Sequence, residues 1–265
     1  MKVNAEYEAT EGDIFNYNLT DTKINDVCGF RNFDGKQKDI VCIGAAQTLG
    51  RFVHYDYPIL IQNNSNYSVA NLGWGGVGIH QYNTQDFIEY INNAKLLICQ
   101  ITSGRSTPNL HKNFNIDNCL IRDIPTQIDE LYKNDYNKFI ECFEKNSIDY
   151  LRDSQSFRNK IKIPVIYIYV SPCDISVRTV PSKYTKWNPL IYSFPHLITH
   201  KMVKQLVGND KLGCFVQPKF FKLPSKPNNY KAVIQHSDVF FTNQYYPDQE
   251  THYDIAEFCI KNINI

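Results

Sequence analysis

The chain has 265 residues, of which 43% are hydrophobic and 21% are charged, and its formal net charge is +1. These values are ordinary for a soluble globular protein and leave no strong field that would attract nucleic acid or an acidic membrane. The length suits one α/β domain with a sizeable core. We therefore expect a single domain over residues 1–265, with an irregular N-terminal arm over residues 1–37.

Two features of the sequence predict a cytoplasmic protein. The stretch MKVNAEYEATEGD contains no apolar signal core, and no apolar run approaches the length of a membrane span. The eight cysteines form no CxxC pair and show no metal-like spacing with histidine. We therefore expect reduced thiols and no metal site. The sequence leaves the oligomeric state open.

Five short apolar runs predict the strands of one sheet. They cover residues 39–45, 67–76, 94–103, 163–172 and 211–221. Such runs are typical of parallel strands that are buried on both faces.

Helical patterns fill the intervals between these runs. They cover residues 48–64 with an interruption near Pro58, residues 84–94 with Thr84 as the N-cap, one or two helices over residues 123–153, and residues 196–208 and 250–263. Strands that alternate with helices predict a three-layer α/β/α sandwich around a mostly parallel five-stranded sheet, similar to SGNH and flavodoxin-like folds.

Four segments follow the carboxyl ends of predicted strands, where open parallel sheets bind ligands. The first is the corner GAAQTLGR, which lacks the lysine and the Ser/Thr of a phosphate loop and so argues against nucleoside triphosphate binding. Ala46 leaves room for a substrate, Gln47 and Thr48 can hydrogen-bond it, and Arg51 can meet a phosphate or sulfate. The alternative is a plain strand–helix turn.

The next two segments supply further polar groups. Asn71, Gly73 and Gly76 belong to NLGWGGVG, which offers an amide and backbone N–H groups for an oxyanion site, although close backbone packing also explains glycines. Ser103, Arg105 and Asn109 follow the third strand, and the Arg105 fork suits a carboxylate, phosphate or sulfate. A structural salt bridge is the alternative for Arg105.

The fourth segment is DQETH, which ends at His252. A histidine after a loop and at a helix start can act as a general base, and the neighbouring Asp248 and Glu250 could orient it or contact the substrate. The alternative is a surface histidine that caps a helix.

Taken together, GAAQTLG, NLGWGG and DQETH resemble the Gly-Asp-Ser, Asn-x-Gly and Asp-x-x-His blocks of the SGNH hydrolase superfamily. The resemblance covers residues 38–105 and 240–265 and implies catalytic roles for His252 and for Asn71 with Gly73. Ala46 stands where that family has its nucleophilic serine, and Gln249 stands three residues before the histidine. Alanine cannot attack a carbonyl, so an acyl-enzyme at this position is excluded.

Five stretches also resemble an uncharacterised bacterial family of SGNH-like proteins, of the domain-of-unknown-function kind. They are GAAQTLGRFV, NLGWGGVG, SGRSTPN, FPHLIT and YYPDQETH. This resemblance implies an accessory role in surface-polysaccharide synthesis or modification. A fainter similarity is to capsule acetyltransferases of SGNH type, whose first block reads Gly-Asn-Cys-Gln.

Three functions follow. The favoured one is group transfer or ester hydrolysis on a carbohydrate or on an acyl or anionic small molecule, with His252 as general base and Asn71 and Arg105 as partners. The second is sulfotransferase-like transfer with Arg51 and Arg105 as anion clamps. The third is a glycan-binding pseudoenzyme. A donor such as acetyl-CoA or adenosine 3′-phosphate 5′-phosphosulfate (PAPS) fits the first two, and no nucleic acid or membrane partner is expected.

Overall fold

The computed structural model describes residues 1–12, 14–116, 124–171, 173–186, 188, 190–191, 196–216, 221–222, 242–243 and 246–265. At its centre is a five-stranded sheet with the strand order β2-β1-β3-β4-β5. The strands are β1 (Ile40–Ile43), β2 (Val69–Asn71), β3 (Leu96–Gln100), β4 (Val165–Ser171) and β5 (Lys211–Val216). All pairings within this sheet are parallel, which confirms the predicted fold class.

Side chains of each central strand alternate between two buried faces of the sheet. Ile40 and Cys42 of β1 belong to one apolar cluster, whereas Val41 and Ile43 belong to the other. This alternation follows from the two-residue period of a strand. All four residues are fully buried, so both faces of β1 are covered.

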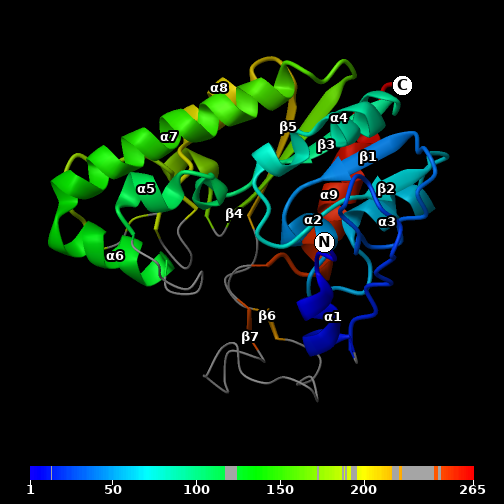
Figure 1. Cartoon of the computed structure of the whole chain (residues 1–265), viewed down its shortest axis with the longest axis horizontal. Coiled ribbons are helices and arrows are strands. Elements are labelled where there is room, and N and C mark those ends of the chain that lie inside the picture. The colour runs from blue at the N-terminus through cyan, green and yellow to red at the C-terminus, as the bar shows by residue number, and fades with distance from the viewer. Residues whose placement is uncertain are drawn as a thin grey trace.

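Two layers of helices cover the two faces (Figure 1). Helices α3 (Tyr57–Asn63) and α9 (Gln249–Asn262) pack on the face that carries Ile40 and Cys42. Helices α4 (Gln85–Asn92), α7 (Tyr136–Arg158) and α8 (His200–Val207) cover the other face. The predicted three-layer sandwich is therefore present.

Two further helices pack against α7 at a distance from the sheet, as Figure 1 shows. They are α5 (Leu110–Phe114) and α6 (Ile124–Asn134). The predicted one or two helices over residues 123–153 are thus the two helices α6 and α7. A short antiparallel pair, β6 (Phe221–Lys222) with β7 (Thr242–Asn243), lies outside the main sheet.

The helix predicted over residues 196–208 is shorter than expected at its start. The Thr199 hydroxyl accepts a hydrogen bond from the Met202 N–H at 3.2 Å, so α8 begins at His200. Leu197 has a left-handed backbone with φ of 52°, which prevents a helix through the preceding residues. Gly208 ends the helix as predicted.

The N-terminal segment contains a helix that the sequence pattern did not predict. Helix α1 (Ala5–Glu11) buries Tyr7 and Glu11, which lie one turn apart on a single face. Seven residues are too few to show a helical period against a polar background. In the part of the chain that the structure describes, no helix is both long and apolar enough to span a membrane.

Candidate functional site

A cavity of about 630 Å³ opens at the carboxyl ends of β1, β2 and β3. Residues that follow β1 and β3 form one side of it, and these two strands flank the point where the strand order reverses. Sheets of the order 2-1-3-4-5 bind their ligands at this switch point. The volume is also in the range of about 300–1,000 Å³ that small-molecule pockets occupy. The edge predicted from the sequence is therefore the edge that carries the cavity.

The corner between β1 and α2 (Ala46–Leu49) forms the floor of the cavity and is held by close contacts. Gly44 has φ of 155°, and a Cβ there would lie 2.2 Å from Thr48 Oγ1 and 2.5 Å from Gln100 Oε1. The Tyr82 hydroxyl donates to the Gly44 carbonyl at 2.9 Å. Glycine at position 44 thus lets the corner approach the end of β3.

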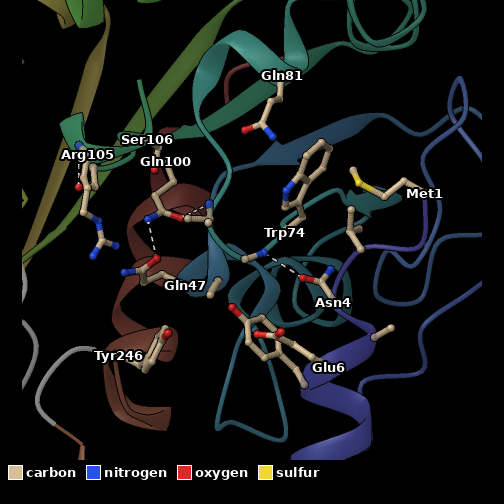
Figure 2. A pocket seen from close by; sticks show the side chains of 18 of the residues that line it. Met1, Asn4, Glu6, Gln47, Trp74, Gln81, Gln100, Arg105, Ser106 and Tyr246 are labelled. Atoms are coloured by element: carbon tan, nitrogen blue, oxygen red, sulfur yellow. Dashed lines mark hydrogen bonds between the residues drawn. The ribbon is translucent and has the colours of Figure 1, made fainter. Parts of the chain in front are cut away.

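A chain of hydrogen bonds connects this corner to β3. The Gln100 Oε1 atom accepts from the Ala45 N–H at 2.9 Å and from the Thr48 hydroxyl at 2.8 Å. The Gln100 Nε2 atom donates to Gln47 Oε1 at 3.1 Å (Figure 2). The Tyr57 hydroxyl donates to Thr48 Oγ1 at 3.1 Å and completes the chain from below. Both glutamine side chains are consequently fixed in one orientation.

The opposite wall combines the turn after β2 with the N-terminal segment. Asn4 Oδ1 accepts from the Gly75 N–H at 2.9 Å, and Asn4 Nδ2 donates to the Gly73 carbonyl at 3.1 Å. Trp74 and Tyr7 line the cavity beside this contact, as Figure 2 shows for Trp74 and Asn4. The N-terminal arm therefore belongs to the site rather than only covering the sheet.

Residues after β3 form the remaining side. Ser103 begins the short helix η2 (Gly104–Ser106), where its hydroxyl accepts from the Arg105 N–H at 3.2 Å and donates to the His196 carbonyl at 3.1 Å. Arg105 and His196 both line the cavity. Burial, together with the nearby Arg178 and Arg105 guanidinium groups, holds the pKa of His196 well below its usual value. His196 is therefore neutral at pH 7.

Arg51 lies outside the cavity lining, in a buried ion pair with Glu11. Its guanidinium Nε donates to Glu11 Oε1 at 3.0 Å, and the Glu11 side chain is 0% exposed. The guanidinium carbon lies 4.1 Å from the ring centre of Tyr7 and 5.1 Å from that of Tyr246. A pair this enclosed holds α1 on the sheet, which explains why Arg51 does not face a ligand.

His252 is fully buried in the first turn of α9 and is not among the residues that line the cavity. Its Nδ1 accepts from the Tyr57 N–H at 3.1 Å, its ring stacks on Tyr57, and its Nε2 has no hydrogen-bond partner among the described residues. Burial first, and the positive charge of Arg31 second, lower the pKa of His252 to about 3. A neutral imidazole with so low a pKa is a weak base.

Five of the twelve predicted site residues line the cavity, namely Ala46, Gln47, Gly76, Ser103 and Arg105. The other seven lie elsewhere: His252, Asn71, Thr48, Arg51, Gly73, Asn109 and Glu250. Their roles in binding or catalysis stay predictions.

Most of the seven residues outside the cavity have a structural role. Asn71 donates to the Thr48 carbonyl and accepts from the Gly73 N–H, both at 2.9 Å, and Asn109 donates to Asp149. A Cβ on Gly73 would lie 2.3 Å from the Leu49 nitrogen, so this glycine serves close packing. Glu250 is exposed on α9.

Sequence reasoning missed several residues of the cavity. Gln100 had a signal, because it is the polar last residue of the otherwise apolar strand LLICQ. His196 and Trp74 lie in stretches that were singled out, but nothing there assigned them a role. Asn4 and Tyr7 had no signal, because their contacts are with residues about 70 positions further along the chain. Within the described ranges, no three His, Cys, Asp or Glu side chains gather as metal ligands would.

Residues 14–114 match a family model described as a domain of unknown function (DUF6473). This segment contains β1, β2 and β3 and less than half of the chain. The match agrees with the predicted resemblance to a domain of unknown function, whereas a role in polysaccharide modification stays a prediction. No curated protein sequence matches the chain.

Two solved structures are similar in overall chain path, and both are lipases. The lipase Lip_vut3 from a goat rumen metagenome is 10% identical, with a TM-score of 0.43 over 82% of this chain and 93% of that one. An extracellular lipase from Streptomyces rimosus is 8% identical, with a TM-score of 0.43 over 83% of this chain and 98% of that one. Lipase activity is a property of those two proteins.

Proposed function

We propose that the cavity binds a hydrophilic small molecule of the carbohydrate class and that the protein does so without forming a covalent intermediate. The observation that carries this proposal is the make-up of the cavity wall. Ala46 lies on the floor after β1, where the SGNH-like pattern would require a nucleophile, while amide and aromatic side chains surround it.

Amide side chains suit the hydroxyl groups of a sugar. Gln47, Gln100, Gln81 and Asn4 all line the cavity. Asn4 Nδ2 already donates to the Gly29 and Gly73 carbonyls and Gln100 Oε1 already accepts two hydrogen bonds, so the capacity left for a ligand lies mainly in the N–H groups of the three glutamines. A sugar hydroxyl both donates and accepts, so such a wall can match several hydroxyls at once. Fixed amides also bind with little loss of side-chain entropy, because their rotamers are already set by the internal hydrogen bonds.

Aromatic side chains complete the match. Trp74, Tyr7 and Tyr246 line the same cavity. An aromatic ring offers an apolar face against which the C–H face of a pyranose can pack. Apolar and aromatic walls with a few fixed polar groups are the usual composition of a small-molecule site.

A second candidate function is hydrolysis or group transfer by direct attack, with His252 as the base. The observation that favours it is the Nε2 atom of His252, which is buried without a partner. Because Nδ1 accepts from the Tyr57 N–H, the neutral ring carries its proton on Nε2, so this atom would donate to a water or hydroxyl that reached it and would have to lose that proton before acting as a base. Against it stand the complete burial of the side chain and a pKa lowered to about 3.

Titration of the full chain with neutral monosaccharides, followed by calorimetry and by Trp fluorescence, tests the binding proposal. We expect saturable binding that Ala45→Leu weakens by about tenfold, because a larger side chain at this partly exposed position narrows the cavity. Ala9→Leu adds the same atoms on the exposed part of α1 and should leave binding unchanged. Absence of binding to any sugar would overturn the proposal.

The catalytic alternative is tested in the same samples by following the sugar, acetyl-CoA and PAPS over time by NMR. The binding proposal predicts no turnover in the wild type and none in Ala46→Ser on an activated acetate ester. Turnover that His252→Gln abolishes while the fold is retained would instead establish the catalytic alternative.

A further inference from the structure

We infer that the end of the cavity formed by Gln47 and Arg105 selects an oxyanion on the bound carbohydrate, so that the ligand is an acidic sugar. Gln47 is then a specificity-determining residue. This inference rests on the proposed function, because it places one group of a ligand that the cavity as a whole is proposed to hold.

The first step is the orientation of the Gln47 amide, which the hydrogen-bond chain determines. The Ala45 N–H can only donate, so the atom of Gln100 that it meets at 2.9 Å is the oxygen. The other terminal atom of Gln100 is then the Nε2 donor, and the Gln47 atom 3.1 Å away from it is Oε1. The Nε2 of Gln47 is left over, and Figure 2 shows it on the cavity side.

The second step is that this orientation cannot easily reverse. A flipped Gln47 would bring its NH₂ group against the NH₂ group of Gln100, and two donors would face each other. A flipped Gln100 would lose the bonds from Ala45 and Thr48 in turn. Gln47 therefore presents a donor to the ligand, and a group that only accepts hydrogen bonds fits it best.

The third step is the positive charge around the same end. Arg105 follows β3 as Gln47 follows β1, and both side chains line the cavity. Arg178 lies near His196 with a side chain that is 0% exposed. Its Nε donates to the Ile198 carbonyl at 3.0 Å and its Nη1 to the Ser171 hydroxyl at 3.3 Å, whereas its Nη2 has no hydrogen-bond partner among the described residues. Within the described residues no carboxylate forms an ion pair with Arg178.

A buried cation without a carboxylate favours the approach of an anion. The charges of Arg178 and Arg105 also reach His196 in the cavity wall, where both of them lower its pKa. The lining residue Glu6 carries the opposite charge and belongs to the N-terminal wall. The acidic group of the ligand therefore points to the Gln47 and Arg105 end, and the neutral part of the sugar faces Trp74.

The test compares glucuronate with glucose, which differ in one carboxylate, by calorimetry on the full chain. We expect glucuronate to bind about tenfold more tightly, since hydrogen bonds to a charged group are stronger than those to a neutral one. Inorganic sulfate and phosphate form separate arms. If they compete with glucuronate but not with glucose, the site recognises an oxyanion rather than a carboxylate alone.

The variant that tests Gln47 is Gln47→Glu, which keeps the size of the side chain and replaces its donor by a negatively charged acceptor. It should remove the preference for glucuronate, about a tenfold loss, and change glucose binding little. Gln62→Glu is the matched control, because it keeps the acceptor for the Val69 N–H and adds the same charge outside the cavity.

Each outcome has one meaning. Equal affinities for glucose and glucuronate in the wild type would overturn the inference and leave the proposed function standing. Binding of neither sugar would overturn the proposed function itself. Equal losses in Gln47→Glu and Gln62→Glu would show a general effect of charge and would remove the assigned role of Gln47.

Discussion

Two buried histidines, each near an arginine, allow a comparison between the structural core below the cavity and the cavity wall. His252 belongs to the first region and His196 to the second. His252 lies near Arg31, which forms an ion pair with Asp56 at 2.9 Å, and both of these side chains are at most 2% exposed. His196 lies near Arg178, for which the described residues offer no carboxylate.

Both imidazoles are neutral because burial and a nearby cation disfavour their charged form. The difference lies in how the cations are balanced. Where the chain supplies its own carboxylate, as in the pairs Arg31–Asp56 and Arg51–Glu11, the charges hold the N-terminal segment and the loop before α3 in place. Where the described residues supply none, as at Arg178, the proposed acidic ligand would balance the charge. Buried arginines alone would not have distinguished these roles.

The largest expected loss of stability comes from breaking the buried ion pair between Arg51 and Glu11. Arg51→Met leaves the Glu11 carboxylate buried without its cation and should lower the free energy of unfolding by about 3–5 kcal/mol. Arg178→Met removes a cation that has no carboxylate partner among the described residues, together with the donor to the Ile198 carbonyl, and should lower the free energy of unfolding by about 1–3 kcal/mol. Chemical denaturation of both variants measures the difference. Equal losses would show that Arg178 is as structural as Arg51.

The second prediction concerns pH. The pKa of His252 is about 3 in the folded protein and about 6.5 in the unfolded chain, so the unfolded state binds the proton more readily between these values. This contribution to stability is complete above pH 6.5 and falls by about 1.4 kcal/mol per pH unit below it. His196 acts in the same direction because its pKa is also lowered.

Denaturation of the wild type and of His252→Gln between pH 7 and pH 4 checks this prediction. The stability of the variant should depend less steeply on pH, and the same should hold for His196→Gln. Asp56 acts in the opposite direction, because burial raises its pKa, and it is present in all three proteins. A slope that neither substitution changes would contradict the buried, neutral state of both rings.

A smaller effect is expected in the hydrogen-bond chain that connects the two regions. Gln100→Leu leaves the Ala45 N–H and the Thr48 hydroxyl without their acceptor and should cost about 1–3 kcal/mol. It should also remove the preference for an acidic sugar, since Gln47 loses its support. Gln62→Leu removes an acceptor from the Val69 N–H at the other end of the sheet and serves as the control. Binding by that control should equal the wild type.

The smallest effect concerns the two glycines beside Trp74. A Cβ on Gly75 would lie 2.0 Å from the Tyr7 hydroxyl, so Gly75→Ala should displace Tyr7 and weaken sugar binding. A Cβ on Gly76 meets nothing within 4 Å, but φ there is 75°, so Gly76→Ala should cost about 1 kcal/mol and leave Tyr7 in place. Calorimetric titration and thermal unfolding distinguish the two. Equal sugar affinities in the two variants would show that Tyr7 does not contribute to sugar binding.

Much of the fold could be predicted because it depends on local patterns. The five apolar runs and the alternation with helices are sufficient for the sheet and its layers, and the carboxyl ends of the strands give the correct edge for the cavity. Gln47 and Arg105 were predicted at those ends, and both line the cavity. The predicted start of the helix over residues 196–208 was less accurate, because it depends on a single contact, the Thr199 cap.

The candidate site could be predicted only in part, because burial and long-range contacts decide which polar residues face the ligand. Arg51 and Arg105 look alike in the sequence, but Arg105 lines the cavity whereas Arg51 is held outside it by the distant Glu11. His252 lies in a motif-like segment, yet its ring packs on Tyr57 beneath the corner. The N-terminal wall has no sequence pattern that indicates it.

That wall has a practical consequence for anyone who purifies this protein. Met1 lines the cavity, and its amino group donates a hydrogen bond to the Asp26 carbonyl. A purification tag joined ahead of Met1 would therefore extend from the edge of the cavity. Ile265 is 39% exposed at the other end of the chain, where it is not among the cavity residues. A tag placed after Ile265 would leave the ligand titrations undisturbed.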